Sequence, residues 1–533
     1  MAGMRRGIAA IAVCTALLGV MSADVQAAPE RHPILFVHGF EGTGAQFESQ
    51  ALRFTSNGYP ADWIDEVDYN SSAAAGSSQA VQAQIDAKIA ELKRRTGATQ
   101  VDLVGHSLGT TVDEQYLTDS SRGAERRASV AHYINVDGQT TNPGVPTLAL
   151  WGGIPIMSSD DAPSKHMDGA KNVTIPHQTH VQVCTSLESF REMYRFLTGE
   201  DPAHDIVPET GSIQLSGRAV SFPDNTGLDG ATIEIWPLDA TGHRATSAPT
   251  ATVAARGAGE GGGDFGPATV QAGTRYEFNL IRPGSATALH IYREPFVRSD
   301  HAVRLLASDA IQAGGGGRPG STSTISIRYK ELWGDKGDGS DQVSVNGTNL
   351  CSPAVCPTNH NVNGLSGYDV NRDGQSEAGQ PDGTFSNVPF LSGTDVFVAA
   401  DTAAKGTATW TLRSRGAGPV RTVTVPTWDS TNIGTVIQWD DYEPASEVER
   451  TTTGSGVPSG SNGKTCKRKV PVRLRHRLHS IRVSGSGVTK RRIRLPHKRF
   501  RVKLKGSARV TVVVRGKTAK GRHVVERHRY RVC

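Results

Sequence analysis

The sequence predicts an α/β domain, with a mostly parallel sheet covered by helices on both faces, followed by all-β sandwich-type domains. Three observations support this fold class. Short apolar strands alternate with amphipathic helices from Ile34 to about Leu197. One strand runs directly into a Gly-x-Ser-x-Gly motif at residues 105–109, where a helix begins. After Pro202 the pattern changes to alternating strands interrupted by Gly, Pro and Asn, which is typical of β-sandwiches.

Apolar periodicity places the elements of the α/β region. Apolar residues spaced by three and four predict helices, and short apolar runs predict strands. The predicted strands are Ile34–Val37, Val101–Val104, Val130–Val136, Thr147–Trp151 and Asn172–Ile175. The predicted helices are Gln79–Arg95, one that opens at Ser107, and Leu187–Leu197.

A chain of 533 residues is too long for one hydrophobic core, so several domains are expected. Changes in composition predict a signal peptide (1–28), an α/β domain (29–200), a β-sandwich domain (205–295), a β-rich domain (296–443), a linker (444–463) and a basic small β-domain (464–533). In the last of these, alternation such as that of Val510, Val512 and Val514 predicts strands.

The first 28 residues have the features of a secretory signal. Arg5 and Arg6 precede an apolar run, and Val25-Gln26-Ala27 suits a small-residue cleavage site. The run is short for a transmembrane helix, and no later stretch reaches about 18 apolar residues. We therefore expect a secreted, extracellular protein without a transmembrane segment after signal removal.

The charge is divided unevenly along the chain. Residues 464–533 carry a net charge of +24 with Glu526 as their one acid, whereas the remainder carries −18. Such a module attracts anionic surfaces in a salt-dependent way. Two interpretations stay open: attachment to an anionic cell surface, and a solvated basic domain without a fixed partner. With Phe500 and Tyr530 as its only aromatic residues, nucleic acid is the less favoured partner.

Export permits disulfides, and the cysteine positions suggest two of them. Cys351 and Cys356 lie five residues apart in a loop-like stretch, while Cys466 and Cys533 bracket the basic module. We predict the pairs Cys351–Cys356 and Cys466–Cys533, with Cys184 as a free, buried thiol.

Ser107 stands where the strand Val101–Val104 must turn sharply into a helix. The residues two before and two after it come too close for side chains, and both are glycine. This is the layout of a nucleophile elbow, which exposes a serine at a helix N-terminus for acyl transfer. The alternative is a serine that only caps a helix.

A second motif, His38-Gly39-Phe40, directly follows the first strand. In hydrolases with this layout the residue after His-Gly offers a backbone N–H to the developing oxyanion, so we assign one donor to Phe40 and the other to Leu108. Each donor of this kind contributes about 10²–10³ in rate. His38 precedes the turn and is expected to brace the loop.

The chain order in this fold is Ser, acid, His, so the base comes from a late loop. His180 lies immediately before a helical stretch and is the predicted base, with His177 as the alternative. For the acid, Asp137 ends one strand, and Asp160 and Asp161 follow the next. Pattern alone slightly favours the later pair.

The chain resembles the two-domain secreted or archaeal alkaline lipases, in which an α/β-hydrolase domain precedes a β-rich lipid-binding domain. The similarity extends from about residue 32 to 443 and is carried by residues 105–110, 134–138, 179–186, 205–208, 345–347 with the Cys351 and Cys356 pair, and 437–442. It implies Asp137 as the acid, His180 as the base, and lipid binding by residues 296–443.

The resemblance implies a secreted serine hydrolase that cleaves carboxylic esters, a triacylglycerol lipase or carboxylesterase, with no cofactor for catalysis and a lipid or ester substrate at a lipid–water interface. The same machinery serves polyester depolymerases, thioesterases and acyltransferases. A surface-binding protein that uses the fold as a scaffold is the non-enzyme alternative. The segment 41–106 is short for the large helical lid of that family.

One polar loop has the opening of a calcium-binding loop. Oxygen-bearing residues stand at alternate positions, with glycine at the sixth: Asp369, Asn371, Asp373, Gln375 and Glu377. Gln380 stands where an EF-hand has its glutamate. The sequence therefore predicts a structural Ca²⁺, and a plain Asn/Asp/Gly turn fits the same residues.

Overall fold

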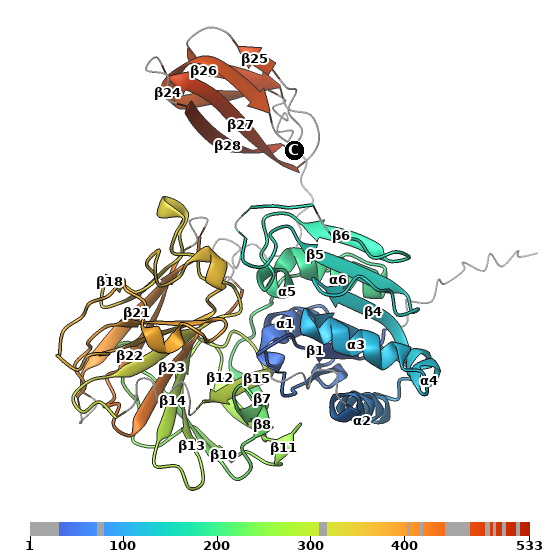
Figure 1. The fold of residues 1–533 in the computed structure, drawn as a ribbon, viewed down its shortest axis with the longest axis vertical. Coiled ribbons are helices and arrows are strands. Elements are labelled where there is room, and N and C mark those ends of the chain that lie inside the picture. Colours follow the sequence, from blue (N-terminus) through green and yellow to red (C-terminus); the bar gives the residue numbers. More distant parts are fainter. Residues whose placement is uncertain are drawn as a thin grey trace, which may run out of the picture. The chain divides into compact units, whose positions relative to one another are not determined.

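The computed structural model describes residues 31–71, 79–158, 160–163, 165–308, 317–401, 405–415 and 419–442, together with strands between 469 and 532 (Figure 1). The chain forms two compact units, residues 1–445 and 446–533. The predicted signal peptide, the linker, and the Cys466–Cys533 pair lie outside the described residues.

The predicted parallel sheet is confirmed, with the strand order β2-β1-β3-β4-β5-β6. Its strands are β1 (Ile34–Val37), β2 (Ile64–Val67), β3 (Val101–His106), β4 (Val130–Val136), β5 (Thr147–Gly152) and β6 (Lys171–Ile175). The helices are α1 (Glu48–Ser56), α2 (Gln79–Thr96), α3 (Leu108–Thr118), α4 (Gly123–Ala128), α5 (Gln182–Thr185) and α6 (Leu187–Thr198). The sequence prediction lacked β2, α1, α4 and α5. In β2 two adjacent acidic residues interrupt the apolar run, and α1 is rich in polar side chains that the fold buries.

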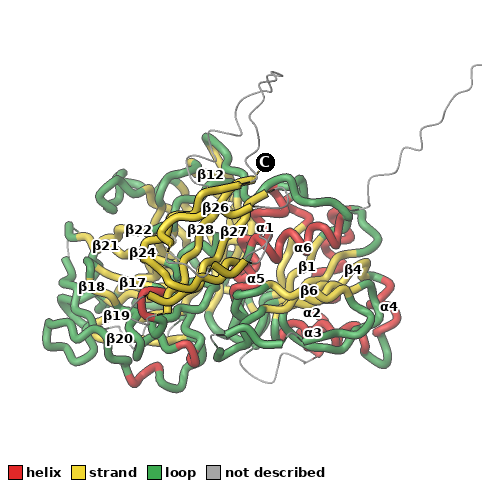
Figure 2. The backbone as a smooth tube through the Cα atoms, turned by 90° about the horizontal axis from the view of Figure 1, so that it is seen from above, coloured by secondary structure: helices red, strands yellow, loops and turns green. Residues whose placement is uncertain are grey.

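Helices cover both faces of this sheet, as the apolar strands require. On one face, Phe54 of α1 and Phe190 of α6 share a core cluster with Phe36 of β1. On the other face, α2 and α3 pack against Leu35 of the same strand. Figure 2 shows α1 and α6 on one side of the strands and α2 and α3 on the other.

The β-rich region contains three further sheets. Their orders are β10-β9-β13-β14-β23-β16-β19-β20, then β11-β8-β7-β12 with β15 paired to β7, and β18-β17-β21-β22. The strands are β7 (Ser212–Ser221), β8 (Thr226–Gly227), β9 (Thr232–Pro237), β10 (Ala251–Ala254), β11 (Gly259–Glu260), β12 (Asp264–Gln271), β13 (Tyr276–Ile281), β14 (Ala288–Arg293), β15 (Asp300–Ala307), β16 (Ser323–Ile327), β17 (Gln342–Val345), β18 (Thr348–Asn349), β19 (Gly364–Tyr368), β20 (Leu391–Asp395), β21 (Thr407–Arg413), β22 (Val420–Pro426) and β23 (Ile433–Gln438).

The eight-stranded sheet is the common wall of two sandwiches. One core lies between it and the five-stranded sheet, and a second lies between it and the four-stranded sheet. β14 pairs with β23, and β15 pairs with β7, so the sheets continue across residues 295 and 296. The domain boundary expected there stays a prediction.

The C-terminal unit contains the β-strands expected from its alternation. These are β24 (Lys469–Ser484), β25 (Arg491–Ile493), β26 (His497–Lys503), β27 (Ala508–Thr518) and β28 (His523–Val532). They pair in the order β25-β24-β27-β28, with β26 also paired to β24.

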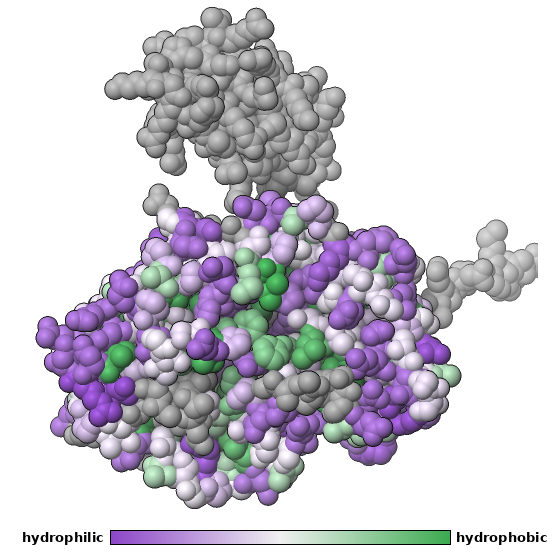
Figure 3. Space-filling view, viewed as in Figure 1, coloured by the Kyte–Doolittle hydropathy of each residue, from purple (hydrophilic) through white to green (hydrophobic). Residues whose placement is uncertain are grey.

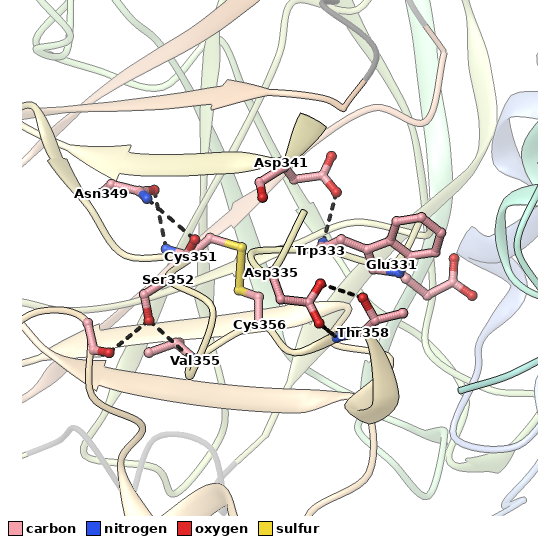
Figure 4. Close-up of a disulfide and its surroundings, with 12 residues drawn as sticks. Glu331, Trp333, Asp335, Asp341, Asn349, Cys351, Ser352, Val355, Cys356 and Thr358 are labelled. Atoms are coloured by element: carbon pink, nitrogen blue, oxygen red, sulfur yellow. Dashed lines mark hydrogen bonds between the residues drawn. A yellow bond between two sulfur atoms is a disulfide. The ribbon is translucent and has the colours of Figure 1, made fainter. Parts of the chain in front are cut away.

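The structure contains the predicted Cys351–Cys356 disulfide, and Cys184 is a buried free thiol, as expected (Figure 4). The disulfide loop packs on the segment that precedes β17. Gly334 donates a backbone hydrogen bond of 2.7 Å to the Cys356 carbonyl, and the carboxylate of Asp335 accepts hydrogen bonds from Thr358.

The loop of residues 369–377, for which the sequence predicts a Ca²⁺ ion, forms a turn that its own side chains stabilise. The carboxylate of Asp369 accepts backbone hydrogen bonds from Arg372 and Gly374, at 2.8 and 3.1 Å. Across the described ranges, no group of three or more His, Cys, Asp or Glu side chains is arranged to hold a metal ion. In the same ranges no helix has the length and apolar character needed to cross a membrane.

Candidate active site

Ser107 occupies a strained turn between β3 and α3. Its φ of 52° and ψ of −117° are unfavourable for a residue with a side chain, and such strain is typical of functional turns. A Cβ atom on Gly109 would lie 2.3 Å from the Val37 carbonyl oxygen, and one on Gly105 would lie 2.1 Å from a carboxylate oxygen of Asp113. The two glycines are therefore required by close approach of neighbouring atoms.

Three predicted side chains form one hydrogen-bonded chain. His180 Nε2 lies 2.9 Å from Ser107 Oγ, and His180 Nδ1 lies 2.6 Å from Asp137 Oδ2. A neutral imidazole that donates from Nδ1 to the carboxylate leaves Nε2 free to accept the serine proton. The His180 and Asp137 side chains are only 11% and 8% exposed, so water competes little for these bonds.

The alternative residues lie apart from this chain. His177 is 83% exposed and pairs with Asp161, whose carboxylate also accepts the His177 backbone N–H at 2.8 Å. Asp160 is exposed. The tertiary structure thus places Asp137, and not the pair that the sequence pattern slightly favours, beside His180.

The loop after β1 runs directly past the nucleophile. A Cβ atom on Gly39 would lie 3.0 Å from Ser107 Cβ, so a side chain at residue 39 would press against the nucleophile. Among the hydrogen bonds of the described residues, none has the backbone N–H of Phe40 or Leu108 as its donor. Both groups are therefore available to a negative oxygen formed beside Ser107 Oγ.

His38 braces this loop, as expected from its position. Its ring stacks on Tyr69 with the centroids 4.4 Å apart, Nδ1 lies 2.8 Å from the Gly39 carbonyl, and Nε2 accepts the Tyr69 backbone N–H at 3.2 Å. Burial lowers the pKa of His38 below its usual value. A neutral His38 matches both hydrogen bonds.

The β-rich region contacts the same loop. Asn225, which precedes β8, donates from Nδ2 to the carbonyls of Gly42 and Tyr69, both at 2.9 Å. Asp68 accepts the Gly44 backbone N–H, and Arg304 of β15 donates to it at 2.8 Å. Burial raises the pKa of Asp68, but the Arg304 and Arg218 guanidinium groups outweigh burial and hold it below its usual range.

The residue before the nucleophile, His106, stabilises the loop that carries His180, which comprises residues 176–181 and is called the histidine loop below. His106 Nε2 donates to the His180 carbonyl at 2.9 Å, and Gln46 Nε2 donates to His106 Nδ1 at 2.5 Å. Burial, followed by the nearby His180, lowers the pKa of His106 well below its usual value, so the ring is neutral. Sequence reasoning missed the supporting roles of His106, Gln46 and Asn225. No motif contains Gln46 or Asn225, and the motif at residues 105–109 leaves the residue before the serine unspecified.

Exposed apolar side chains lie on loops that border the site. Phe40 is 38% exposed, and Ile156 and Met157 are 48% and 63% exposed. The last two follow β5 in a loop that bonds to the histidine loop through Ile154 and the Gln178 carbonyl at 2.9 Å. Figure 3 shows hydrophobic residues gathered in the middle of one face, where the hydrolase and β-rich regions meet. This border suits a substrate with an apolar part.

Comparison with protein families finds three matches along the chain. Residues 31–140 match the class 2 lipase family, residues 211–310 match the lipase C-terminal domain, and residues 316–443 match a further C-terminal domain family. No curated protein sequence matches the chain.

Comparison with solved structures finds remote similarities. A lipase of Bacillus licheniformis in its propeptide form is 12% identical, with 94% of each chain covered and a TM-score of 0.24. A gene product of Listeria innocua is 15% identical and covers 33% of this chain and 97% of its own, with a TM-score of 0.25. A phospholipase of Legionella pneumophila is 8% identical and covers 52% of this chain and 93% of its own, with a TM-score of 0.22. At these TM-scores the similarities carry no argument about the site.

Proposed function

The chain combines a class 2 lipase domain of the α/β-hydrolase fold with a lipase C-terminal domain, and we propose that it is a secreted serine hydrolase that cleaves carboxylic esters. Triacylglycerols and simple carboxylic esters are the leading substrates. The observation that carries the proposal is the hydrogen-bonded chain from Ser107 through His180 to Asp137.

In the proposed mechanism, His180 Nε2 takes the proton from Ser107 Oγ as the oxygen attacks the ester carbonyl. Asp137 holds the imidazole in the required tautomer and stabilises the imidazolium. The N–H groups of Phe40 and Leu108 bind the oxyanion. His180 then protonates the leaving alcohol, which breaks the ester bond and leaves an acyl group on Ser107. Water, activated by His180, releases the acid by the reverse sequence.

The apolar border of Phe40, Ile156 and Met157 supports an acyl chain as the part of the substrate that the site recognises. It also favours action at a lipid–water interface. A polyester, a thioester or acyl transfer to another alcohol would use the same three residues. A series of nitrophenyl esters of increasing acyl length, with triacylglycerol, thioester and polyester substrates alongside, distinguishes these possibilities.

The proposal is tested by Ser107→Ala, with Ser121→Ala on an exposed turn as the matched control. Ser107→Ala should abolish hydrolysis of a nitrophenyl acyl ester and covalent labelling by a fluorophosphonate, while Ser121→Ala keeps both. Activity retained by Ser107→Ala refutes the mechanism. A wild-type protein that neither hydrolyses esters nor takes up the label would instead be a surface-binding protein on a hydrolase scaffold.

Export is part of the proposal and is tested separately. We expect the mature protein in the culture medium, with an N-terminus near Ala28, because residues 1–28 have the composition of a signal peptide. N-terminal sequencing of the protein from the medium measures this. An intact N-terminus on protein found only inside cells would contradict it.

We further propose that the basic C-terminal unit attaches the enzyme to anionic membrane surfaces. The backbone register of its strands pairs basic residues with one another: Lys469 with Lys503, Arg473 with Arg499, Arg482 with Arg515, and Arg509 with Arg531. Like charges at opposite positions are unfavourable in a sheet, and a bound polyanion would offset this cost.

The attachment is tested with liposomes that contain phosphatidylglycerol and with neutral phosphatidylcholine liposomes. The full chain should bind the anionic liposomes at low salt and lose binding as salt rises. A chain truncated after Tyr442 should lose this binding and keep ester hydrolysis. Equal binding by the truncated chain, or binding indifferent to salt, contradicts the proposal.

A further inference from the structure

The loop that carries His180 is held by a carboxylate from a distant part of the chain. Glu331 lies in the β-rich region after β16 and is 1% exposed. Its Oε1 accepts the backbone N–H of Val181 at 2.9 Å, and its Oε2 accepts the hydroxyl of Thr179. One carboxylate therefore binds both residues that flank His180 in the chain.

His106 also binds this loop, because its Nε2 donates to the His180 carbonyl at 2.9 Å. Residues 179–181 lie after β6 ends at Ile175 and before α5 begins at Gln182, so no strand or helix fixes them. Their positions depend on these tertiary hydrogen bonds. The bond of 2.9 Å between His180 Nε2 and Ser107 Oγ depends in turn on the loop.

Hydrogen bonds to the backbone carbonyl of Glu331 fix the position of this residue. Arg328 Nη2 donates to the Glu331 carbonyl at 3.1 Å, and Arg415 Nη1 donates to the same oxygen. The Asp341 carboxylate lies between the two guanidinium groups and accepts a hydrogen bond of 2.8 Å from each of them. Arg415 also donates to the side chain of Gln182 at 3.2 Å, so the cluster also contacts the first residue of α5, directly after the loop. Figure 4 shows the Glu331 side chain directed away from the disulfide, with Asp341 bonded to the backbone of the neighbouring Trp333.

We propose that Glu331 is a positioning residue, which fixes the His180 ring at the distance from Ser107 that proton transfer requires. This inference rests on the proposed function. The β-rich region would then be an integral part of the catalytic site as well as a substrate-binding domain. Because Glu331 contacts the loop backbone and Thr179, it acts through the loop on the rate of the chemical step, and hardly on ester binding.

The main test compares Glu331→Ala with Glu331→Gln on a nitrophenyl ester. Glu331→Ala should lower kcat by about 10²-fold with KM nearly unchanged, since a displacement of the base by about 1 Å costs about that factor. Glu331→Gln keeps an oxygen for the Val181 N–H and places an amide beside the Thr179 hydroxyl, which can accept from it. Its kcat should return to within a few-fold of the wild type. The rate of fluorophosphonate labelling should follow kcat in both variants.

A second route does not require substitution of Glu331 itself. Thr179→Val removes one of the two bonds and should lower kcat by several-fold. In the double variant with Glu331→Ala, the second change should add little, because both act through one interaction. Full additivity of the two effects would overturn the inference.

Glu48→Gln is the matched control. Glu48 of α1 forms a buried ion pair with Arg293 of β14, which also joins the hydrolase and β-rich regions but involves none of residues 177–182. It should lower the melting temperature and leave kcat unchanged. An unchanged kcat in Glu331→Ala, or equal losses of kcat in Glu331→Ala and Glu48→Gln, overturns the positioning role. Retained activity in Ser107→Ala would instead refute the proposed function, so the two failures are distinguishable.

Discussion

Replacement of Asp137 by asparagine tests the assignment of the acid most directly. The Asp137 carboxylate lies 2.6 Å from His180 Nδ1 and is 8% exposed, so water competes little for the imidazole N–H. In Asp137→Asn the side-chain amide can donate to Nδ1, which leaves the ring proton on Nε2. Such a tautomer cannot accept the Ser107 proton.

The loss expected from this change is large. In the serine-protease triad, the corresponding change lowers kcat by about 10⁴-fold, which corresponds to about 5 kcal/mol of transition-state stabilisation. We expect a similar loss in kcat for a nitrophenyl ester, with a melting temperature close to that of the wild type, because asparagine has nearly the same volume as aspartate. The rate of fluorophosphonate labelling should fall in parallel.

Asp161→Asn is the matched control, because Asp161 follows the next strand and pairs with the exposed His177. It should leave kcat unchanged. Full activity in Asp137→Asn, with loss of activity in Asp160→Asn or Asp161→Asn, would refute the assignment and return the acid to the later pair.

Four further predictions concern stability. Both carboxylate oxygens of Asp113 lack a partner within the described residues, and burial raises its pKa well above the usual value. The neutral form is therefore favoured in the fold, and wild-type stability should fall by up to about 1.4 kcal/mol per pH unit above about pH 4, until the raised pKa is reached. Urea unfolding of Asp113→Asn should lack this slope, and parallel pH profiles would contradict it. Replacement of Cys351 and Cys356 by serine should lower the free energy of unfolding by about 2 kcal/mol, because a short loop is no longer closed; an unchanged urea midpoint would exclude this. If the loop of Asp369 binds Ca²⁺, EDTA should lower the melting temperature and added Ca²⁺ should restore it, whereas no change argues for a plain turn. Gly109→Ala places a methyl group 2.3 Å from a backbone oxygen of β1. It should lower the free energy of unfolding by about 1–3 kcal/mol or more, and it should also lower kcat. Wild-type values of both quantities would refute the steric argument.

Local sequence was enough to predict the nucleophile and its surroundings. The strand, the two glycines around Ser107 and the helix start occupy one continuous segment, and their geometry follows from backbone sterics. The glycine before Phe40 could be interpreted in the same way, since the loop passes within contact distance of the nucleophile. The apolar strands were equally clear because a parallel sheet buries both faces.

Local sequence was not enough to select the acid. Asp137, Asp160 and Asp161 all follow strands, and the pattern slightly favoured the later pair. The resemblance to lipases pointed to Asp137, and the structure places this residue at His180 Nδ1. The histidine loop leaves β6 and turns back over the end of β4, a path that periodicity does not encode.

By itself, the sequence determined the change from an α/β region to all-β regions, the position of Ser107, and the separation of an acidic body from a basic module, because these depend on residues adjacent in the chain. Only the tertiary structure decided which carboxylates meet the histidine loop. Asp137 lies 43 residues before His180 and Glu331 lies 150 residues after Val181. Such contacts arise when separate core clusters pack together, and hydrophobic packing constrains shape and burial without leaving a local motif at the polar residues that it brings into contact.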